Sequence, residues 1–263
     1  MASVVIDRLA HASTARGARA TDLARARAAD RLAGRTVWCA TALPAGRGAA
    51  RTLRGSLTAD GCVPARDLEI TADEPLRLLA ERLDQALRLA SAVASPARGA
   101  APGRVGRGDQ AVYDEGVRDG EALAGDAFGP GDVVVLHDAL AAALAEAVRE
   151  RGAHAVWDVA LGGAPARGAV GAAWEFMRRH TAPIDAFVMS WTEPGHGGAP
   201  VERIAAAMPS AGVVATKEIA AEGADAERLR NRGWSALLAD IVRGDRGECV
   251  GGTLHARPTV PAR

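Results

Sequence analysis

Short apolar runs alternate with longer amphipathic stretches along most of this chain. The short runs are rich in branched aliphatic residues and predict strands at residues 36–43, 66–70, 132–136, 153–160 and 184–190. The longer stretches carry apolar side chains at helical spacing and predict helices at residues 3–32, 73–89, 110–127, 139–151, 169–180 and 201–207. This alternation is typical of βαβ crossovers, so we expect an α/β fold: a single Rossmann-like domain with a mainly parallel sheet.

Glycine and proline positions divide the chain into three expected parts. An N-terminal helical segment covers residues 1–33 and stops at Gly34. The Rossmann-like domain covers residues 34–220 and contains a linker or loop at 91–109, where Ala, Pro, Gly, Ser and Arg dominate. Residues 221–263 are expected to form a C-terminal helical extension, centred on a stripe from Trp234 to Ile241, and a Gly/Pro-rich tail.

Composition and charge exclude several classes of partner. The formal net charge is zero, and aromatic residues make up 3% of the 263 residues, which argues against nucleic acid and anionic membranes as partners. The three cysteines lack CxxC spacing, so we expect no metal site and a reduced, cytoplasmic protein. No stretch is apolar enough for a signal peptide or a membrane span, and no motif calls for a cofactor.

A polar pair, His137 and Asp138, directly follows the apolar strand 133–136. In open parallel sheets ligands bind at the carboxyl edge, because loops and helix N-termini converge there. The pair is therefore a candidate binding site. In the alternative interpretation, both side chains only satisfy backbone groups at the turn between strand and helix.

Gly46, Arg47 and Gly48 follow the first predicted strand in a short loop before a helix. A strand, glycine loop and helix present free backbone N–H groups and a positive dipole end to an anion. Phosphate contact and a plain tight turn both fit this pattern. Arg47 and Arg51 could pair with an anionic group or lie in solvent at the start of the helix.

Two further polar positions follow later strands. Asp158 lies toward the end of strand 153–160, and Glu193 and His196 follow strand 184–190 in a glycine-rich loop. A Glu and a His three residues apart are suited to acid–base work, although no nucleophile lies beside them in sequence. A surface loop without such a role is the alternative for Glu193 and His196.

These motifs together resemble a known domain. Residues 34–55, 131–138, 152–162, 174–177 and 208–217 occur in the order and spacing of the N-terminal, acceptor-side half of trehalose synthase-like glycosyltransferases. These are retaining family-4 enzymes of the GT-B type, relatives of trehalose-phosphate synthase. The resemblance covers roughly residues 30–220.

The resemblance is degenerate at three motifs. The family's triple-glycine loop, followed by Val-Ala-Glu, here reads Gly46-Arg47-Gly48-Ala49-Ala50-Arg51. Its His-Asp-Pro-Gln reads His137-Asp138-Ala139-Leu140. Its Trp-Arg-Cys-His, whose histidine lies in the reaction centre, reads Trp157-Asp158-Val159-Ala160, without the histidine. Trp157 and Trp174 fit core packing better than sugar stacking.

The resemblance implies an acceptor cradle for a sugar or sugar phosphate. Asp138 would accept sugar hydroxyls, His137 would donate to a hydroxyl or phosphate, and Arg47 would pair with an anion. The family binds its nucleotide sugar in a second domain, and 46 residues after Lys217 leave no room for one. We therefore expect no sugar transfer by the isolated chain, and either a homo-oligomer or a partner that supplies the donor domain.

Three functions remain open at this stage. The first is a glycosyltransferase-like protein in a biosynthetic pathway, completed by a partner. The second is a non-catalytic module that binds a small molecule or a protein. The third is an unrelated small-molecule enzyme on the same scaffold, because a fold does not determine a function.

Overall fold

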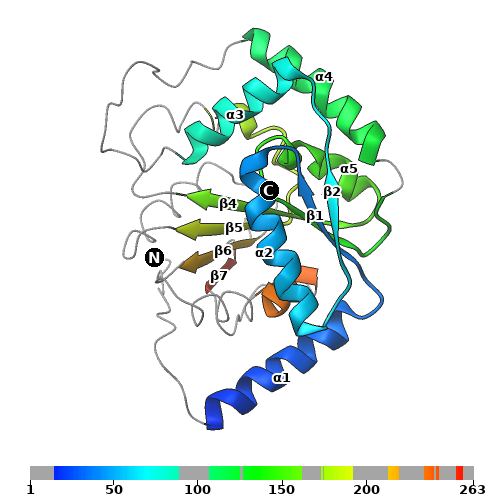
Figure 1. The fold of residues 1–263 in the computed structure, drawn as a ribbon, viewed down its shortest axis with the longest axis vertical. Helices are drawn as coiled ribbons and strands as arrows, with labels where there is room; N and C mark the ends of the chain where they lie inside the picture. The colour runs from blue at the N-terminus through cyan, green and yellow to red at the C-terminus, as the bar shows by residue number, and fades with distance from the viewer. Residues whose placement is uncertain are drawn as a thin grey trace, which may run out of the picture.

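A seven-stranded sheet forms the centre of the protein in the computed structural model, which describes residues 15–88, 107–124, 127–161, 173, 175–191, 213–218, 234–239, 241–242 and 253–256. Figure 1 shows the strands side by side, with helices around them. The strands are β1 (Val37–Thr41), β2 (Ala65–Glu69), β3 (Val133–Leu136), β4 (His154–Leu161), β5 (Ala186–Trp191), β6 (Val213–Glu218) and β7 (Thr253–Ala256).

The sheet order is β2-β1-β3-β4-β5-β6-β7. All neighbours pair in parallel except β6 and β7, which are antiparallel. The predicted α/β fold with a mainly parallel sheet is therefore confirmed. The chain passes from β1 to β2 on one side and later returns to place β3 on the other side of β1, so the order reverses between β1 and β3.

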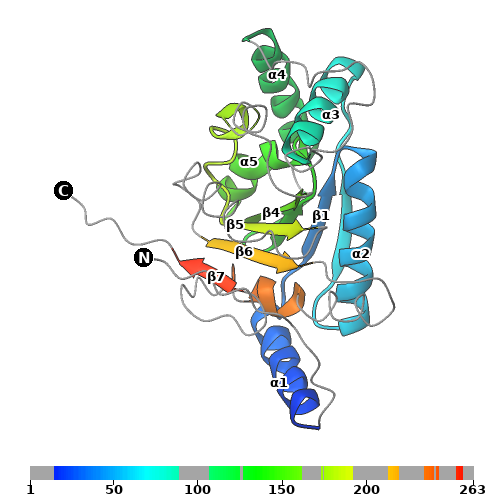
Figure 2. The same cartoon turned by 90° about the vertical axis from the view of Figure 1, so that its left-hand side faces the viewer.

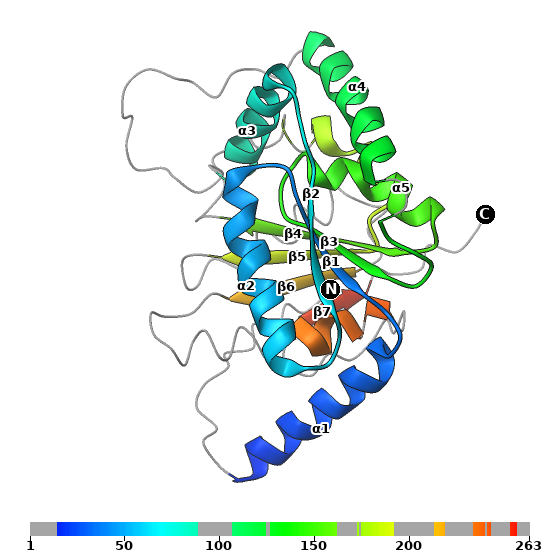
Figure 3. The same ribbon diagram turned by 45° about the vertical axis from the view of Figure 1, so that its right-hand side comes forward.

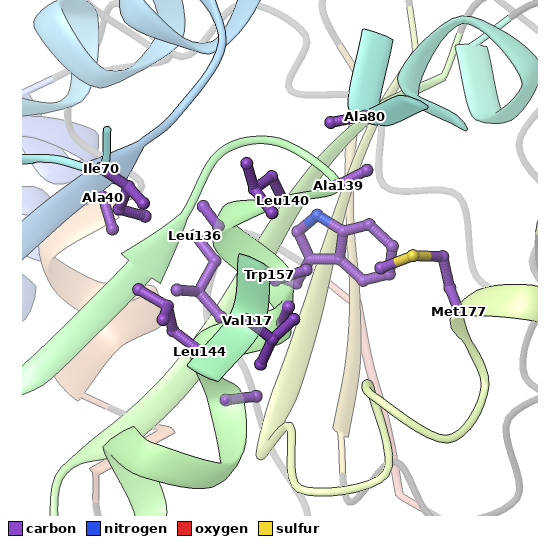
Figure 4. Packing of buried hydrophobic residues seen from close by; sticks show 14 of the residues in the cluster. Ala40, Ile70, Ala80, Val117, Leu136, Ala139, Leu140, Leu144, Trp157 and Met177 are labelled. Atoms are coloured by element: carbon purple, nitrogen blue, oxygen red, sulfur yellow. The ribbon is translucent and has the colours of Figure 1, made fainter. Parts of the chain in front are cut away.

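Successive residues of each buried strand point to opposite faces of the sheet, and each face packs against its own helices. One core cluster contains Val134, Leu136, Ala155, Trp157 and Phe187. It is covered by α3 (Glu74–Arg88), α4 (Arg107–Ala124), the 3-10 turn η1 (Ala141–Leu144) and α5 (Ala145–Glu150). Figure 4 shows the Trp157 indole packed beside Ala139, Leu140 and Met177.

The other face carries the second core cluster, with Val133, Val135, Val156, Ala186 and Val188. It is covered by α1 (Ala15–Leu32), α2 (Pro44–Asp60) and the helical residues 234–239 and 241–242. In Figure 2 α1 and these orange helical turns lie below the strands, and α3, α4 and α5 lie above them. Both ends of the described chain therefore contribute to one core.

Local signals in the sequence set where the helices begin and end. Gly34 adopts a φ of 74° directly after α1, and Gly61 adopts a φ of 64° at the end of α2, where its N–H reaches the carbonyls of Leu57 and Thr58. Asp73 accepts a hydrogen bond from the Leu76 N–H (3.0 Å), which caps the start of α3.

Two strands went unrecognised in the sequence. The prediction treated residues 213–218 only as part of a motif and 253–256 as tail, whereas they form β6 and β7. Both are short and lie beyond the regular alternation, so periodicity alone gives little signal. The expected linker at 91–109 is wrong at its end, because residues 107–109 form the start of α4. The rest of that linker and the expected helix at 201–207 lie outside the described residues. Among the described helices, none has the length and apolar character needed to cross a membrane.

Replacing Leu238 tests whether the C-terminal helical residues belong to the core. Leu238 is fully buried against the sheet, so Leu238→Ala is expected to lower the free energy of unfolding by about 2–5 kcal/mol. Leu78→Ala is the control, because Leu78 is 47% exposed, and its effect should stay within about 0.5 kcal/mol. Urea unfolding measures both; equal effects would show that residues 234–242 do not pack on the sheet.

Candidate functional site

The carboxyl ends of β1 and β3 meet at the point where the strand order reverses. The connection after β1 leads into α2 on one face, and the connection after β3 leads through η1 into α5 on the other face. Figure 3 shows α2 and α5 on either side of these strands. Open α/β sheets in general bind ligands where the strand order reverses in this way, in a crevice between the two strand ends. His137 and Asp138 lie at this edge, and Gly46 packs against them, as the sequence predicts.

The Asp138 side chain is committed to the backbone. One carboxylate oxygen accepts hydrogen bonds from the N–H groups of Ala42 (2.7 Å) and Leu43 (2.9 Å), and the other accepts from Ala141 (2.8 Å). The residue is 1% exposed. Burial raises the pKa of the Asp138 carboxyl, and the three backbone N–H groups and the nearby His137 oppose that rise. Asp138 therefore joins the two strand ends, which matches the structural alternative rather than sugar binding.

Gly46, Arg47 and Gly48 lie in the first turns of α2, so the loop predicted for them is incorrect. Pro44 begins the helix, where its fixed φ is favourable and its missing N–H costs nothing. A Cβ built at Gly46 would lie 2.9 Å from an Asp138 carboxylate oxygen and 3.3 Å from the His137 Cβ. Glycine at 46 thus permits close approach between α2 and the end of β3.

Arg47 points away from this crevice. Its guanidinium pairs with the Glu69 carboxylate at the end of β2, and both side chains are more than half exposed. The side chain therefore lies at the outer edge of the sheet. Its position does not favour the predicted contact with an anionic ligand.

His137 has one partnered and one unpartnered ring nitrogen. Its Nδ1 lies 3.2 Å from a carboxylate oxygen of Asp158 on β4, and because a carboxylate only accepts, Nδ1 carries the hydrogen. The Nε2 atom is buried and has no hydrogen-bond partner within the described part of the chain. His137 as a whole is 2% exposed. An unpartnered buried polar atom usually costs stability, so Nε2 is the atom of this edge that a further hydrogen-bond donor would stabilise.

Of the remaining candidate residues, some lie outside the described part of the chain and others are buried in the core. Glu193 and His196 lie outside the described residues, and so does the Trp174 side chain. Trp157 is 1% exposed and belongs to the core cluster on the α3 side, as predicted. No cluster of three His, Cys, Asp or Glu side chains suited to a metal ion occurs among the described residues.

Tyr113 on α4 forms a hydrogen bond at the same edge of the sheet, and the sequence analysis did not identify it. It is fully buried, and its hydroxyl donates a hydrogen bond to the Ala139 carbonyl, directly after Asp138. Helical spacing identifies Tyr113 only as a core position.

A surface hollow of about 470 Å³ lies away from this edge, between α3 and α4, where Leu78 and Val112 line it.

Comparison with known proteins found no match, either to a family model or to a curated protein. The assignment of the site therefore depends on its geometry.

A matched pair of glycine substitutions in α2 tests the close approach at residue 46. Gly46→Ala is expected to destabilise the protein by about 1–3 kcal/mol, because its Cβ would collide with the fixed Asp138 carboxylate. Gly48→Ala is expected to stabilise it by about 0.5–1 kcal/mol, because a Cβ there meets nothing within 4 Å and alanine favours helix. Thermal unfolding of both variants measures the difference; stabilisation by both would contradict the contact.

Asp138→Asn tests the backbone clamp. The amide group would place an N–H donor against at least one of the three backbone donors, so we expect a loss of about 1–3 kcal/mol in unfolding free energy. Asp67→Asn is the control, since Asp67 is half exposed and pairs with Arg54 on the surface, and it should cost less than about 1 kcal/mol. If Asp138→Asn is as stable as the control, the backbone hydrogen bonds to the wild-type carboxylate contribute little to stability. The carboxylate would then be available to a ligand instead.

Proposed function

We propose that this protein binds a hydroxyl-bearing small molecule, a sugar or sugar-like compound, at the crevice between the carboxyl ends of β1 and β3. The observation that carries this proposal is the buried, unpartnered Nε2 of His137. A ligand hydroxyl that donates to this nitrogen would satisfy the one orphaned side-chain atom found among the described residues. The edge of the sheet at which it lies supports the same assignment.

The pairing with Asp158 defines what His137 can do. With the hydrogen on Nδ1, the neutral imidazole presents Nε2 as a hydrogen-bond acceptor. An imidazole oriented by a carboxylate in this way is suited to polarise a bound hydroxyl and to remove its proton. That chemistry agrees with an acceptor site, in which a sugar hydroxyl is prepared for transfer.

The glycosyltransferase-like assignment enters this proposal through the resemblance at His137 and Asp138. In the family this pair follows a strand of the acceptor-side domain, and here it follows β3 at the crevice. We propose a role in a biosynthetic pathway, with a partner or a second copy supplying a nucleotide-sugar site.

Simple binding without transfer is the second candidate. The resemblance places a reaction-centre histidine at position 160, and this chain has Ala160 there. A protein that keeps the crevice and lacks that histidine would recognise a small molecule as a sensor or carrier. Detection of sugar transfer in the presence of nucleotide sugars and candidate partner chains would separate the two functions.

His137→Asn tests the binding proposal. The asparagine amide can keep the hydrogen bond to Asp158, while the acceptor at Nε2 is removed. We expect binding of neutral sugars, screened by ligand-observed NMR, to weaken about ten- to a hundredfold, which corresponds to about 1.5–3 kcal/mol. Unfolding is measured beside binding, because the smaller buried side chain leaves a cavity and its Oδ1 replaces Nε2 as an atom without a donor.

His154→Asn is the matched control for this test. His154 begins β4 at the opposite, amino end of the sheet, so its replacement should leave ligand affinity unchanged. If both variants bind the same sugars as well as the parent protein does, His137 is not the contact and the proposed function is wrong.

A further inference from the structure

A polar cluster joins α4 to residues 175–181, the segment that leads toward β5. The Asp114 carboxylate accepts hydrogen bonds from Gln110 on the same helix (2.9 Å) and from the Arg179 guanidinium. The Nε2 atom of His180 lies 3.0 Å from the Gln110 Nε2 and 3.2 Å from the Arg179 Nε. These four residues, the His180 cluster, are not part of the proposed binding site.

The geometry of the cluster defines the proton state of His180. Arginine has no acceptor atom, so the Arg179 Nε donates to the ring nitrogen. The Gln110 amide is oriented by the Asp114 carboxylate, which only accepts, and so it also presents an N–H to His180. A hydrogen on Nε2 would face the hydrogens of both donors. The neutral ring therefore accepts both bonds, and the charged ring can accept neither.

The charged and titratable groups that face His180 come, within the described residues, from two elements. Arg179 lies on the same segment, and Asp114 and Tyr113 lie on α4. Burial lowers the pKa of the His180 ring, Arg179 lowers it further, and Asp114 acts in the opposite direction. Burial acts to raise the pKa of Asp114, but hydrogen bonds from Arg179 and Gln110 outweigh it and lower that pKa. Burial raises the pKa of the Tyr113 hydroxyl well above its ordinary value, so Asp114 stays charged and Tyr113 neutral while His180 titrates.

The His180 ring also packs against the aromatic side chains of this contact. Its centroid lies 4.8 Å from that of Tyr113, edge to face, and the Tyr113 and Phe176 centroids are 5.3 Å apart. Tyr113 is fully buried, and its hydroxyl donates to the Ala139 carbonyl at the carboxyl edge of the sheet. One side chain therefore contacts both His180 and that edge.

We infer that His180 acts as a pH switch in the contact between α4 and residues 175–181, which is tight when the ring is neutral and loosens when Nε2 takes up a proton. Protonation removes the hydrogen bonds from Gln110 and Arg179 and places a second positive charge beside the guanidinium. Asp114 compensates only in part, since its Oδ1 lies 3.4 Å from Nε2 and already accepts from Gln110. This inference does not depend on the proposed function.

The direction of the pH effect follows from the lowered pKa of the ring. Above the ordinary histidine value of 6.5 the folded and unfolded chains both carry a neutral His180, and the contact contributes fully to stability. Below that value the unfolded chain takes up the proton more readily, so the contribution is lost as the pH falls.

The test uses Tyr113, which is the one tyrosine of the chain. Full-length protein carrying ¹³C-tyrosine and ¹⁵N-histidine is titrated by NMR from about pH 8 to about pH 5, the range in which histidines change charge. The His180 signal is assigned by its contact with the tyrosine ring, and we expect the tyrosine signal to move with the same midpoint. Amide hydrogen exchange is followed over the same range and expressed as protection relative to the intrinsic rate at each pH. Protection of residues 107–124 and 175–184 should fall at least about threefold with that midpoint, while α2 changes less than about twofold.

His180→Gln and His154→Asn separate this histidine from another with a lowered pKa. The glutamine oxygen can accept from Arg179 in place of Nε2, and it does not titrate, so the fall in protection should disappear. Burial also lowers the pKa of His154, which begins β4 at the amino end of the sheet. His154→Asn should therefore keep the response of residues 107–124.

Three results would overturn the inference: a His180 signal that does not titrate down to about pH 5, constant protection while that signal titrates, or an equal fall in protection in His180→Gln. If His180→Gln does not fold, the parent protein decides, because the midpoints of the His180 signal and of the protection must then coincide. Loosening in the parent and in His154→Asn, but not in His180→Gln, supports the switch.

Discussion

Three backbone N–H groups donate hydrogen bonds to one buried carboxylate, and these bonds hold the ends of β1 and β3 together. Asp138 accepts from Ala42 and Leu43 at the end of β1 and from Ala141 at the start of η1. Ala42 and Leu43 lie 96 and 95 residues from Asp138 in sequence, and they meet it only because β1 and β3 are neighbours in the sheet. A buried charge is tolerated when its hydrogen-bonding capacity is met, and its removal would leave several donors unsatisfied.

The position of α2 follows from this clamp. With the chain before the helix held at Ala42 and Leu43, the first turn of α2 lies so close to β3 that residue 46 has no room for a side chain. His137 is then enclosed between the helix start and β4, where Asp158 orients its ring. The ring is thus oriented from its Nδ1 side, while Nε2 is buried without a partner among the described residues.

The sequence predicts the fold well and the site only in part. Apolar runs place β1 and β3 to β5 correctly, because buried parallel strands leave a strong signal in composition. The largely exposed edge strand β2 is predicted from a short run only. The same signal is weak for β6 and β7. The His137-Asp138 pair predicts the correct edge of the sheet, but the sequence gives no sign that Asp138 faces backbone N–H groups from another strand. Glycines 46 and 48 look like a phosphate loop, whereas Pro44 starts a helix there.

Neighbouring polar residues at a strand end need not share a function, because the strand period sends them in different directions. His137 continues the series Val133 and Val135 and meets Asp158, whereas Asp138 reaches the backbone beyond the sheet edge. Asp138 therefore fixes the scaffold, whereas His137 keeps a buried ring nitrogen that has no partner among the described residues. The clamp also has an electrostatic consequence: the Leu43 N–H directly before α2 donates to the internal Asp138 carboxylate, so this donor is not available to another anion at the start of the helix.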